Sequence, residues 1–354
     1  MAIHSLCGGI FWLAYLAGFL VLKFSIVLPT YNRANMLPSA LETLQFQTFK
    51  DFEVLIIDDG STDRTPEIIG KWTIDPRFKY HRLPKNIGNM ACRNLALEMA
   101  VGEWITNIDS DDFWLPNRLE RFNAFIGANP GAEFVFSNGY LLRFDRIVGH
   151  AFPPDMPLMD GRVPGHYAVG MDDLPYLTTN LAIKRSLYQK YGNYRDDMMI
   201  LDNELYARML RDGVQVGIIR ESLALRRVHD GQVTHNWIEE YPEAIEALTV
   251  SGVSSAVFLA KQKKLILDIA GYFLKNLQPK ESRSFLVGKL GASGKRTSIY
   301  WKTFTPVWLL KALKGLRAAY LKLRYHTFWA SKDFQHAYFR IQHLLVEEKN
   351  RMAL

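Results

Sequence analysis

The chain has 354 residues, of which 48% are hydrophobic and 22% charged, with 24 glycines and 15 prolines. This composition is that of an ordinary folded protein, and it excludes disorder, collagen-like repeats and low-complexity assembly. Its two cysteines, Cys7 and Cys92, are too few for a disulfide framework or a four-cysteine zinc site, which indicates a reducing compartment. The formal net charge of +7 is uneven, because residues 1–240 carry a net charge of −5 and residues 241–354 one of +12.

The first 22 residues contain no charged side chain, and residues 6–22 form an apolar run just short of the roughly 20 residues that span a bilayer. Only Lys23 separates this run from the first expected strand. Neither a basic n-region nor a clear small-residue cleavage site marks a secretory signal. We therefore treat residues 1–22 as an apolar N-terminal segment, either a spanning helix, a loosely docked segment or the product of a misplaced start codon.

After Lys23, apolar runs of strand length alternate with stretches of helical spacing. The expected strands are residues 24–29, 52–59, 78–84 and 103–109, and the expected helices lie within 35–46, 58–72 and 89–100. The first two strands are continuous apolar runs that end in polar residues, as strands buried on both faces of a parallel sheet do. The second helix is expected to open at Thr65 and Pro66, with Ser61 or Thr62 as its N-cap. This alternation predicts a doubly wound α/β domain.

The rest of the chain continues the mixed pattern and then becomes helical. In chain order we expect a helix over 115–131, a strand over 132–145, an irregular stretch over 150–175, a strand and a helix over 178–192, a helix over 201–213 and a last pair of strands over 214–228. From Trp237 onward the spacing is helical. Between Ser282 and Lys332 there are 11 basic residues and no acidic one, so any nucleic-acid or anionic-membrane partner would be sought here.

Polar side chains recur where the predicted strands end. They are Tyr31, Asn32 and Arg33 after the first strand, Asp58 and Asp59 after the second, and Asp109, Asp111 and Asp112 after the fourth. Asp and Asn are common turn formers, so any one of these positions alone would say little. Because the carboxyl ends of parallel strands meet at one edge of a doubly wound sheet, the three groups together indicate a ligand crevice.

The spacing of Asp109 and Asp111 suits a hard divalent cation, Mn²⁺ or Mg²⁺, that shares the phosphates of a bound nucleotide. Two other nucleotide motifs are excluded. The first strand is not followed by Gly-x-Gly-x-x-Gly. Residues 288–297 look like a phosphate-binding loop, but the glycine spacing is off by one and Arg296 replaces the Ser or Thr that would ligate magnesium. We interpret that segment as a basic loop.

Four segments of the chain form an ordered set. They are FSIVLPTYNRANML, DFEVLIIDDGSTD, NIGNMACRNLALEMAVGEWITNIDSDDFWLPNRLE and LDNELYARML. In this order and spacing they resemble the family 2 glycosyltransferases, over about residues 24–236. The resemblance implies a GT-A fold, an α/β fold with a doubly wound, mostly parallel sheet. It divides the chain into the apolar segment 1–22, a GT-A catalytic domain over 23–236, and a helical, basic C-terminal region over 237–354.

The resemblance also implies roles for single residues. Pro29, Tyr31 and Arg33 would line the nucleotide pocket, Asp59 would accept a hydrogen bond from the base, Arg93 would lie near the nucleotide or its phosphates, and Asp109 and Ser110 would face the ribose and diphosphate. Asp111 would bind the metal, with Asp109 and His229 close to it, and Arg226 or Arg227 could neutralise phosphate.

Asp202 stands where the family keeps its catalytic base. That base takes the proton of the acceptor hydroxyl while the nucleoside diphosphate leaves from the opposite face of the sugar. The family usually has an acidic residue just before it, whereas this chain has Leu201, so Glu204 is a reserve candidate.

The basic C-terminal region has apolar and aromatic residues on a helical stripe over 305–332, with Lys and Arg interleaved. Such a helix can lie in an anionic membrane interface or pack on the catalytic domain. No nucleic-acid module accompanies the charge, so we expect no nucleic-acid partner. The lipid-linked or envelope acceptors that the resemblance implies would place the protein in the cytoplasm, at the inner face of the cell membrane.

The leading hypothesis is a metal-dependent, inverting glycosyltransferase. It would move a sugar from a nucleotide donor, UDP-linked, to a saccharide or glycolipid acceptor in cell-envelope polysaccharide synthesis. The alternative is a non-catalytic, transferase-like scaffold in an envelope-assembly complex, which Leu201 favours. A nucleotidyltransferase is disfavoured, because the first strand lacks the Gly- and Lys/Arg-rich loop that such enzymes use on a triphosphate.

Overall fold

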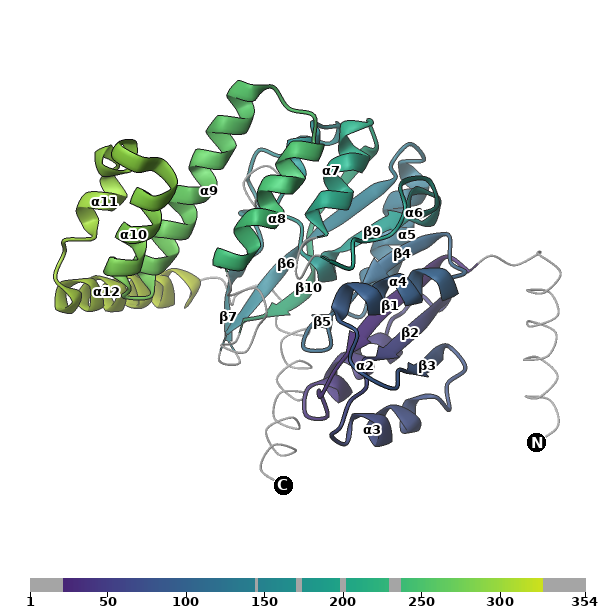
Figure 1. Cartoon of the computed structure of the whole chain (residues 1–354). Helices are drawn as coiled ribbons and strands as arrows, with labels where there is room; N and C mark the ends of the chain where they lie inside the picture. Colours follow the sequence, from purple (N-terminus) through teal and green to yellow (C-terminus); the bar gives the residue numbers. More distant parts are fainter. Residues whose placement is uncertain (1–21, 144–145, 170–173, 198–201, 229–236, 327–354) are drawn as a thin grey trace, which may run out of the picture.

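A computed structural model describes residues 22–143, 146–169, 174–197, 202–228 and 237–326. Within these residues the chain forms one ten-stranded sheet flanked by helices (Figure 1). The strands are β1 (Phe24–Thr30), β2 (Phe52–Asp58), β3 (Phe78–Arg82), β4 (Trp104–Asn107), β5 (Phe113–Trp114), β6 (Phe134–Arg143), β7 (Arg146–His150), β8 (Gly161–Arg162), β9 (Leu181–Lys184) and β10 (Gln215–Arg227).

The strand order is β3-β2-β1-β4-β9-β6-β10-β5, with β7 paired to β6 and β8 to β10. The strands from β3 to β4 are parallel, β6 is parallel to β10, and β9 runs antiparallel to both β4 and β6. Since β9 reverses the direction twice, β1, β2, β3, β4, β6 and β10 all point the same way. Their carboxyl ends therefore share one edge of the sheet.

Helices cover both faces of the sheet. They are α2 (Leu37–Gln45), α3 (Thr65–Trp72), α4 (Asn89–Met99), α5 (Arg118–Ala128), α6 (Arg185–Tyr191) and α7 (Asn203–Arg211). Neighbouring residues of β1 face opposite ways: Ile26 packs in one hydrophobic core with α2, α3 and α5, and Val27 packs in the other with α4, α6 and α7. This two-sided burial confirms the doubly wound α/β prediction.

The C-terminal region is helical, as the spacing predicted. It contains α8 (Trp237–Val250), α9 (Ser255–Lys275), α10 (Pro279–Leu290), α11 (Ser298–Lys302) and α12 (Val307–His326), with a 3₁₀ turn η4 (Gly291–Arg296). A small core around Ile266, Phe273 and Leu286 joins α8, α9 and α10. Figure 1 shows these last helices as a green-to-yellow block beside the sheet, where α8 packs on α7 and α12 reaches β7.

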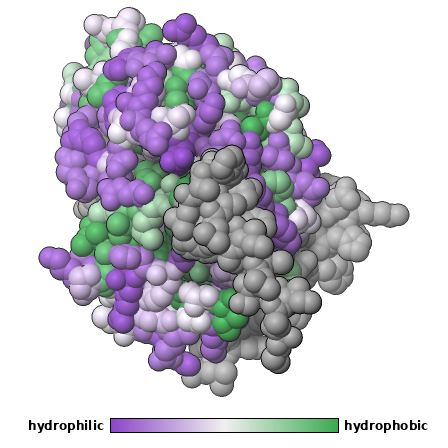
Figure 2. Space-filling model, turned by 90° about the vertical axis from the view of Figure 1, so that its right-hand side faces the viewer, coloured by the Kyte–Doolittle hydropathy of each residue, from purple (hydrophilic) through white to green (hydrophobic). Residues whose placement is uncertain are grey.

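The α11–α12 surface carries exposed apolar side chains. They are Trp301, Phe304, Val307, Trp308, Leu313 and Leu316, with Trp308 71% exposed. Lys302, Lys311 and Lys314 are also exposed there. By contrast, hydrophilic residues cover most of the described surface in the view of Figure 2. Among the helices that the structure describes, none combines the length and apolar character needed to cross a membrane. The apolar segment 1–22 lies, except for Leu22, outside the described residues.

The structure corrects three details of the sequence analysis. The last strand pair is one strand, β10, whose pairing with β6 shifts register between Ile219 and Ala224. Polar Arg220, Glu221 and Ser222 interrupt the apolar run there, which is why it resembled two strands. Neither Ser61 nor Thr62 caps α3, because its N-cap is Arg64. Residues 288–297, expected as a loop, contain the end of α10 and the whole of η4.

Candidate active site

A cavity of about 670 Å³ opens at the carboxyl edge of the sheet. Nine predicted site residues line it: Pro29, Tyr31, Arg33, Asp59, Arg93, Asp109, Ser110, Asp111 and Asp202. His229, the remaining predicted ligand, lies outside the described residues. Residues that are far apart in the sequence thus share one cavity, because the parallel strands bring their ends together.

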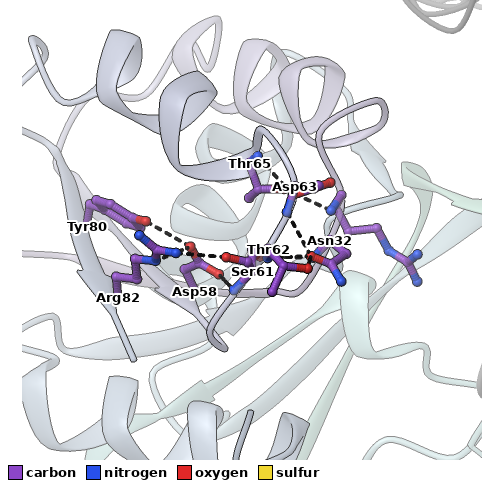
Figure 3. Close-up of polar contacts among 9 residues, drawn as sticks. Asn32, Asp58, Ser61, Thr62, Asp63, Thr65, Tyr80 and Arg82 are labelled. Atoms are coloured by element: carbon purple, nitrogen blue, oxygen red, sulfur yellow. Dashed lines mark hydrogen bonds and ion pairs between the residues drawn. The ribbon is translucent and has the colours of Figure 1, made fainter. Parts of the chain in front are cut away.

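The wall formed by the loop after β1 is held by the loop after β2 (Figure 3). Asn32 adopts a left-handed backbone conformation, with φ of 51°, which Asn tolerates better than most residues. Its Oδ1 accepts a hydrogen bond of 2.8 Å from the backbone N–H of Thr62, and its own N–H donates to Ser61 Oγ at 2.9 Å. Asp63 also links the two loops, because its carboxylate accepts hydrogen bonds from the backbone N–H groups of Ala34 and Thr65.

The two acidic residues at the end of β2 have different partners. Asp58 is fully buried and accepts hydrogen bonds from the hydroxyl of Tyr80 and the backbone N–H of Ser61, both at 2.8 Å (Figure 3). Asp59 accepts from the backbone N–H groups of Ile87 and Gly88, at 2.6 and 3.0 Å. Asp59 therefore fixes the segment that leads into α4, and it does so while lining the cavity.

Helix α4 carries Arg93 into the site. Gly88, the N-cap, has φ of 96°, a conformation that favours glycine and turns the chain into the helix. Arg93 is 2% exposed, and its Nη2 donates to Asp109 Oδ1 at 2.6 Å. Burial alone would lower the pKa of Arg93, but the carboxylates of Asp109 and Asp202 raise it. Its Nε and Nη1 are buried and have no hydrogen-bond partner within the described residues.

The turn after β4, residues 109–112, is called the acidic turn here because it brings the carboxyl groups of Asp109, Asp111 and Asp112 close together. The backbone N–H of Asp112 donates to the carbonyl of Asp109, and Asp112 Oδ1 accepts from the N–H of Arg227 at 2.9 Å. Burial, followed by the charges of Asp111 and Asp109, raises the pKa of Asp112 well above its usual value. The donor set is one of hard oxygens, which suits Mg²⁺ or Mn²⁺. Among the described residues, however, no cluster of three or more acidic, His or Cys side chains forms a complete metal site.

Asp202, the N-cap of α7, lines the same cavity as the acidic turn. Burial raises the pKa of Asp202 to about 6, although Arg93 and a hydrogen bond from Tyr206 act in the opposite direction. The reserve candidate Glu204 is not among the residues that line the cavity. Its two carboxylate oxygens accept hydrogen bonds from Nε and Nη2 of Arg208, at 2.7 and 3.0 Å.

Several lining residues were not singled out by the sequence analysis. They are Thr30, Asn86, Gly88, Asn89, Met90, Thr178, Asp196 and Asp197. Asp196 and Asp197 come from the segment between α6 and α7, where no strand end marked them. Of the two arginines proposed for phosphate, Arg226 lines the cavity, and the guanidinium of Arg227 lies over the ring of Phe113, 4.7 Å from its centroid.

The fold is that of an α/β protein with a ligand-sized cavity at the carboxyl edge of its sheet. Residues 25–141 match the model of the family described as Glycosyl transferase family 2. Over these residues, which include β1 to β4 and the turn after β4, the chain is similar to the family 2 glycosyltransferases.

Relatives described as glycosyltransferases match a part of this chain of similar length. The chain is 40% identical over 116 residues to an uncharacterized glycosyltransferase of Rickettsia felis, covering 33% of this chain and 19% of the relative. It is 34% identical over 136 residues to the putative colanic acid biosynthesis glycosyl transferase WcaA of Escherichia coli, covering 38% and 47%. It is 31% identical over 154 residues to the poly(ribitol-phosphate) β-N-acetylglucosaminyltransferase TarS of Staphylococcus aureus, covering 40% and 26%. The chain spans less than half the length of each of these relatives.

Solved structures share the fold over most of the chain. S. aureus TarS residues 1–349 in complex with UDP-GlcNAc align with a TM-score of 0.56 at 17% identity, covering 84% of this chain and 92% of that one. The mannosyltransferase PcManGT of Pyrobaculum calidifontis, in complex with GDP-Man and Mn²⁺, aligns with a TM-score of 0.52 at 17% identity, covering 91% and 85%. These similarities confirm the predicted GT-A type of fold.

Proposed function

We propose that this protein is a metal-dependent, inverting glycosyltransferase that moves a sugar from a nucleotide donor to a saccharide or lipid-linked acceptor in envelope polysaccharide synthesis. We take residues 23–236 as its catalytic domain. One observation carries the proposal: Arg93, the acidic turn and Asp202 line the same cavity of about 670 Å³. That volume lies within the usual range for ligand sites, about 300–1,000 Å³.

The donor side of the cavity has the chemistry that a nucleoside diphosphate requires. Arg33, Arg93 and Arg226 line it, and a guanidinium binds phosphate oxygens through charge-assisted hydrogen bonds. Arg93 offers Nε and Nη1, two buried donors with no partner in the described part of the chain. Pro29, Tyr31 and Asp59 would surround the base, while Asp109 and Ser110 would face the ribose and diphosphate. An anionic ligand would thus satisfy donors that the protein leaves open.

Asp202 would act as the general base. As the acceptor hydroxyl oxygen attacks the anomeric carbon, its proton passes to the Asp202 carboxylate. The bond between that carbon and the diphosphate oxygen breaks, and its electron pair leaves with the nucleoside diphosphate. A carboxyl group with a pKa of about 6 is mostly ionised at neutral pH and is a stronger base than an ordinary aspartate.

Asp111 and Asp109 would hold Mn²⁺ or Mg²⁺, and His229 is the third predicted ligand. When bound, the ion would supply positive charge that stabilises the departing diphosphate. The fit rests on the hard oxygen donors and on the like charges that crowd Asp112. PcManGT supports this assignment to the extent that its structure contains GDP-Man and Mn²⁺. The UDP and UDP-GlcNAc complexes of TarS support a UDP-linked donor.

The C-terminal region would contact a membrane peripherally. The α11–α12 surface combines exposed aromatic residues with lysines and has no acidic residue between Ser282 and Lys332. Such a surface suits the interface of an anionic bilayer. Since α12 reaches β7, which pairs with the carboxyl-terminal end of β6, this surface belongs to the same edge of the sheet as the cavity. Lipid-linked acceptors at the inner face of the cell membrane would be within reach of such an edge.

A donor screen tests the proposal. A ligand that binds only the folded state raises the melting temperature, so thermal shifts with UDP-, GDP-, dTDP- and CMP-sugars, with and without Mn²⁺, should single out one nucleotide. Slow hydrolysis of the same donor should accompany binding. The scaffold alternative predicts neither a metal-dependent shift nor hydrolysis with any of these donors, and that result would overturn the enzymatic proposal.

A further inference from the structure

Three successive backbone N–H groups after β1 are bound by the side chains of one loop. That loop, called the 61–65 loop here, comprises the residues between β2 and α3 up to the first residue of α3. The N–H groups of residues 32, 33 and 34 donate to Ser61 Oγ, Thr65 Oγ1 and Asp63 Oδ2, at 2.9, 2.9 and 3.1 Å. Ser61 and Thr65 are fully buried. Residues 32–34 belong to no strand or helix, so side chains supply the partners that a regular element would otherwise supply.

The 61–65 loop is itself fixed to two strands of the sheet (Figure 3). The N–H of Ser61 donates to Oδ1 of Asp58, the last residue of β2, at 2.8 Å. The carbonyl of Ser61 accepts from Nη2 of Arg82 on β3 at 2.9 Å. The Tyr80 hydroxyl, also on β3, donates to Asp58 Oδ2 at 2.8 Å. The acceptors of the 61–65 loop therefore stand on a rigid support.

The residues held by the 61–65 loop carry two side chains of the cavity wall. Tyr31 and Arg33 both line the cavity, and Tyr31 is 43% exposed. Within the described residues, neither the Tyr31 hydroxyl nor the Arg33 guanidinium makes a hydrogen bond or an ion pair. The positions of both side chains in the free protein therefore depend on the backbone that carries them, and the 61–65 loop fixes that backbone.

We propose that Ser61, Asp63 and Thr65 are positioning residues of the sugar-donor site, which hold Tyr31 and Arg33 in place for a nucleoside diphosphate. The inference rests on the proposed function, because Tyr31 and Arg33 are assigned there to the nucleotide. Ser61, Asp63 and Thr65 are not among the residues that line the cavity, so they act through the backbone of residues 32–34.

The effect of these contacts is on affinity for the sugar donor. A loop that must become ordered when a ligand binds lowers the affinity, whereas a loop that is already ordered does not. Asn32, at the centre of the held segment, has a φ of 51°, which is a sparsely populated backbone conformation outside glycine. Without its partners the segment would leave this conformation and expose its N–H groups to water. Bound nucleotide would restore the order, so the chemical step would change little.

The test removes single acceptors from the 61–65 loop. Ser61→Ala and Thr65→Val each delete one hydroxyl with little change of shape. Titration calorimetry with UDP and with GDP, each in Mn²⁺, should give a dissociation constant about tenfold higher in either variant, as the loss of one hydrogen bond predicts. The KM for the sugar donor should rise by the same factor, while kcat at saturating donor changes less than about twofold. Thr65→Ser keeps the hydroxyl and should restore the dissociation constant of the unaltered protein.

Two further variants separate this effect from a loss of stability. Ser282→Ala is the matched control, because Ser282 is also fully buried and its hydroxyl donates to the carbonyl of Ala270 at 2.8 Å, in the C-terminal region. This variant should leave the dissociation constant unchanged. Asp63→Ala removes an acceptor at an exposed position, with little risk to folding, and should raise the dissociation constant about twofold to fivefold. Unchanged dissociation constants in the 61–65 variants, or a lower kcat with an unchanged KM, would overturn the inference.

Hydrogen exchange gives a second readout that needs no activity. In the unaltered protein, the N–H groups of residues 32–34 should exchange slowly both with and without nucleotide. In Thr65→Val they should exchange about tenfold faster without nucleotide and slowly again with it. Equal exchange in the two free proteins would overturn the inference. If neither nucleotide bound the unaltered protein, the proposed function would fail instead, and the exchange rates would still decide whether the 61–65 loop fixes residues 32–34.

Discussion

The cavity at the sheet edge and the α11–α12 surface use polar and apolar side chains in opposite ways. Around the cavity, polar groups are buried and paired: Asp58, Asp59 and Arg93 are each at most 4% exposed and make hydrogen bonds to other parts of the chain. On the α11–α12 surface, large apolar groups are exposed, as the 66% and 71% exposure of Trp301 and Trp308 shows. The first arrangement suits a small ligand held in a fixed geometry, and the second suits contact with a broad apolar surface.

Two glycines, one beside the sheet and one in the helical region, differ in the space around them. A Cβ added to Gly102, just before β4, would lie 2.4 Å from the backbone N of Ser25 and 2.6 Å from the carbonyl carbon of Phe24. A Cβ on Gly271 of α9 would meet nothing within 4 Å. The chain is therefore closely packed at Gly102, between β1 and the segment before β4, whereas Gly271 of α9 has room for a side chain.

The largest expected effect comes from filling the crowded position. Gly102→Ala forces apart β1 and the segment before β4, and overpacking of this kind costs about 2–3 kcal/mol. Chemical denaturation should show that loss in the free energy of unfolding. Gly127→Ala, in α5 of the same region, adds a Cβ with nothing within 4 Å and is the matched control. Equal stability of the two variants would contradict the packing difference.

The next largest effect is expected on donor affinity, when the buried guanidinium of Arg93 is removed. Arg93→Met keeps the length of the side chain but removes the donors assigned to the diphosphate, so the donor dissociation constant should rise about tenfold to a hundredfold. Titration calorimetry measures it. Arg121→Met removes an exposed arginine that pairs with Glu221 at 2.7 Å and should leave donor affinity unchanged. Unaltered donor binding in Arg93→Met would show that Arg93 serves only the fold.

A smaller change is expected on the α11–α12 surface. Replacing both Trp301 and Trp308 by Gln should weaken sedimentation with vesicles that contain phosphatidylglycerol about tenfold, because two aromatic anchors are lost. Vesicles of phosphatidylcholine alone should bind weakly in all variants, since the lysines then find no anionic headgroups. Ile74→Gln, which removes an apolar side chain 85% exposed near α3, is the control. Undiminished vesicle binding by the double variant would show that the α11–α12 surface does not bind the membrane.

The smallest expected effect is a gain in the free energy of unfolding. Gly271→Ala places a better helix former in α9 without a clash, and it should stabilise the protein by about 0.5–1 kcal/mol. A rise in melting temperature would show it, and a fall would mean that the helical region is packed as closely as the sheet.

The sequence predicted the parts of the fold that local patterns encode. The strands β1 and β2 were recognised because they are mostly apolar. The residues after them were assigned to a site because parallel strands end at one edge. The reversed direction of β9 was not foreseen, since a run of three apolar residues and a lysine does not encode the direction of a strand. In β10, the polar residues Arg220 to Ser222 concealed the continuity of a strand that tolerates a register shift.

The candidate site was predictable on its donor side and much less so around Asp202. Asp109, Asp111 and Arg93 belong to ordered motifs that stand close together in the sequence. Asp196 and Asp197, which also line the cavity, carry no such signal, because no strand end marks them and aspartates are common in turns. They reach the cavity only after α6 and α7 fold against the sheet. Two successive aspartates shortly before a candidate base are the one signal that could have drawn attention to them.

The central claim is that Asp202 and the acidic turn act on one bound donor, and Asp202→Asn tests it most directly. The amide keeps the shape of the carboxyl group but cannot accept the proton of the acceptor hydroxyl. With the donor identified by the thermal-shift screen, the dissociation constant in Mn²⁺ should stay unchanged while the rate of sugar transfer falls about 100-fold to 10,000-fold. Undiminished transfer by the variant would contradict the account.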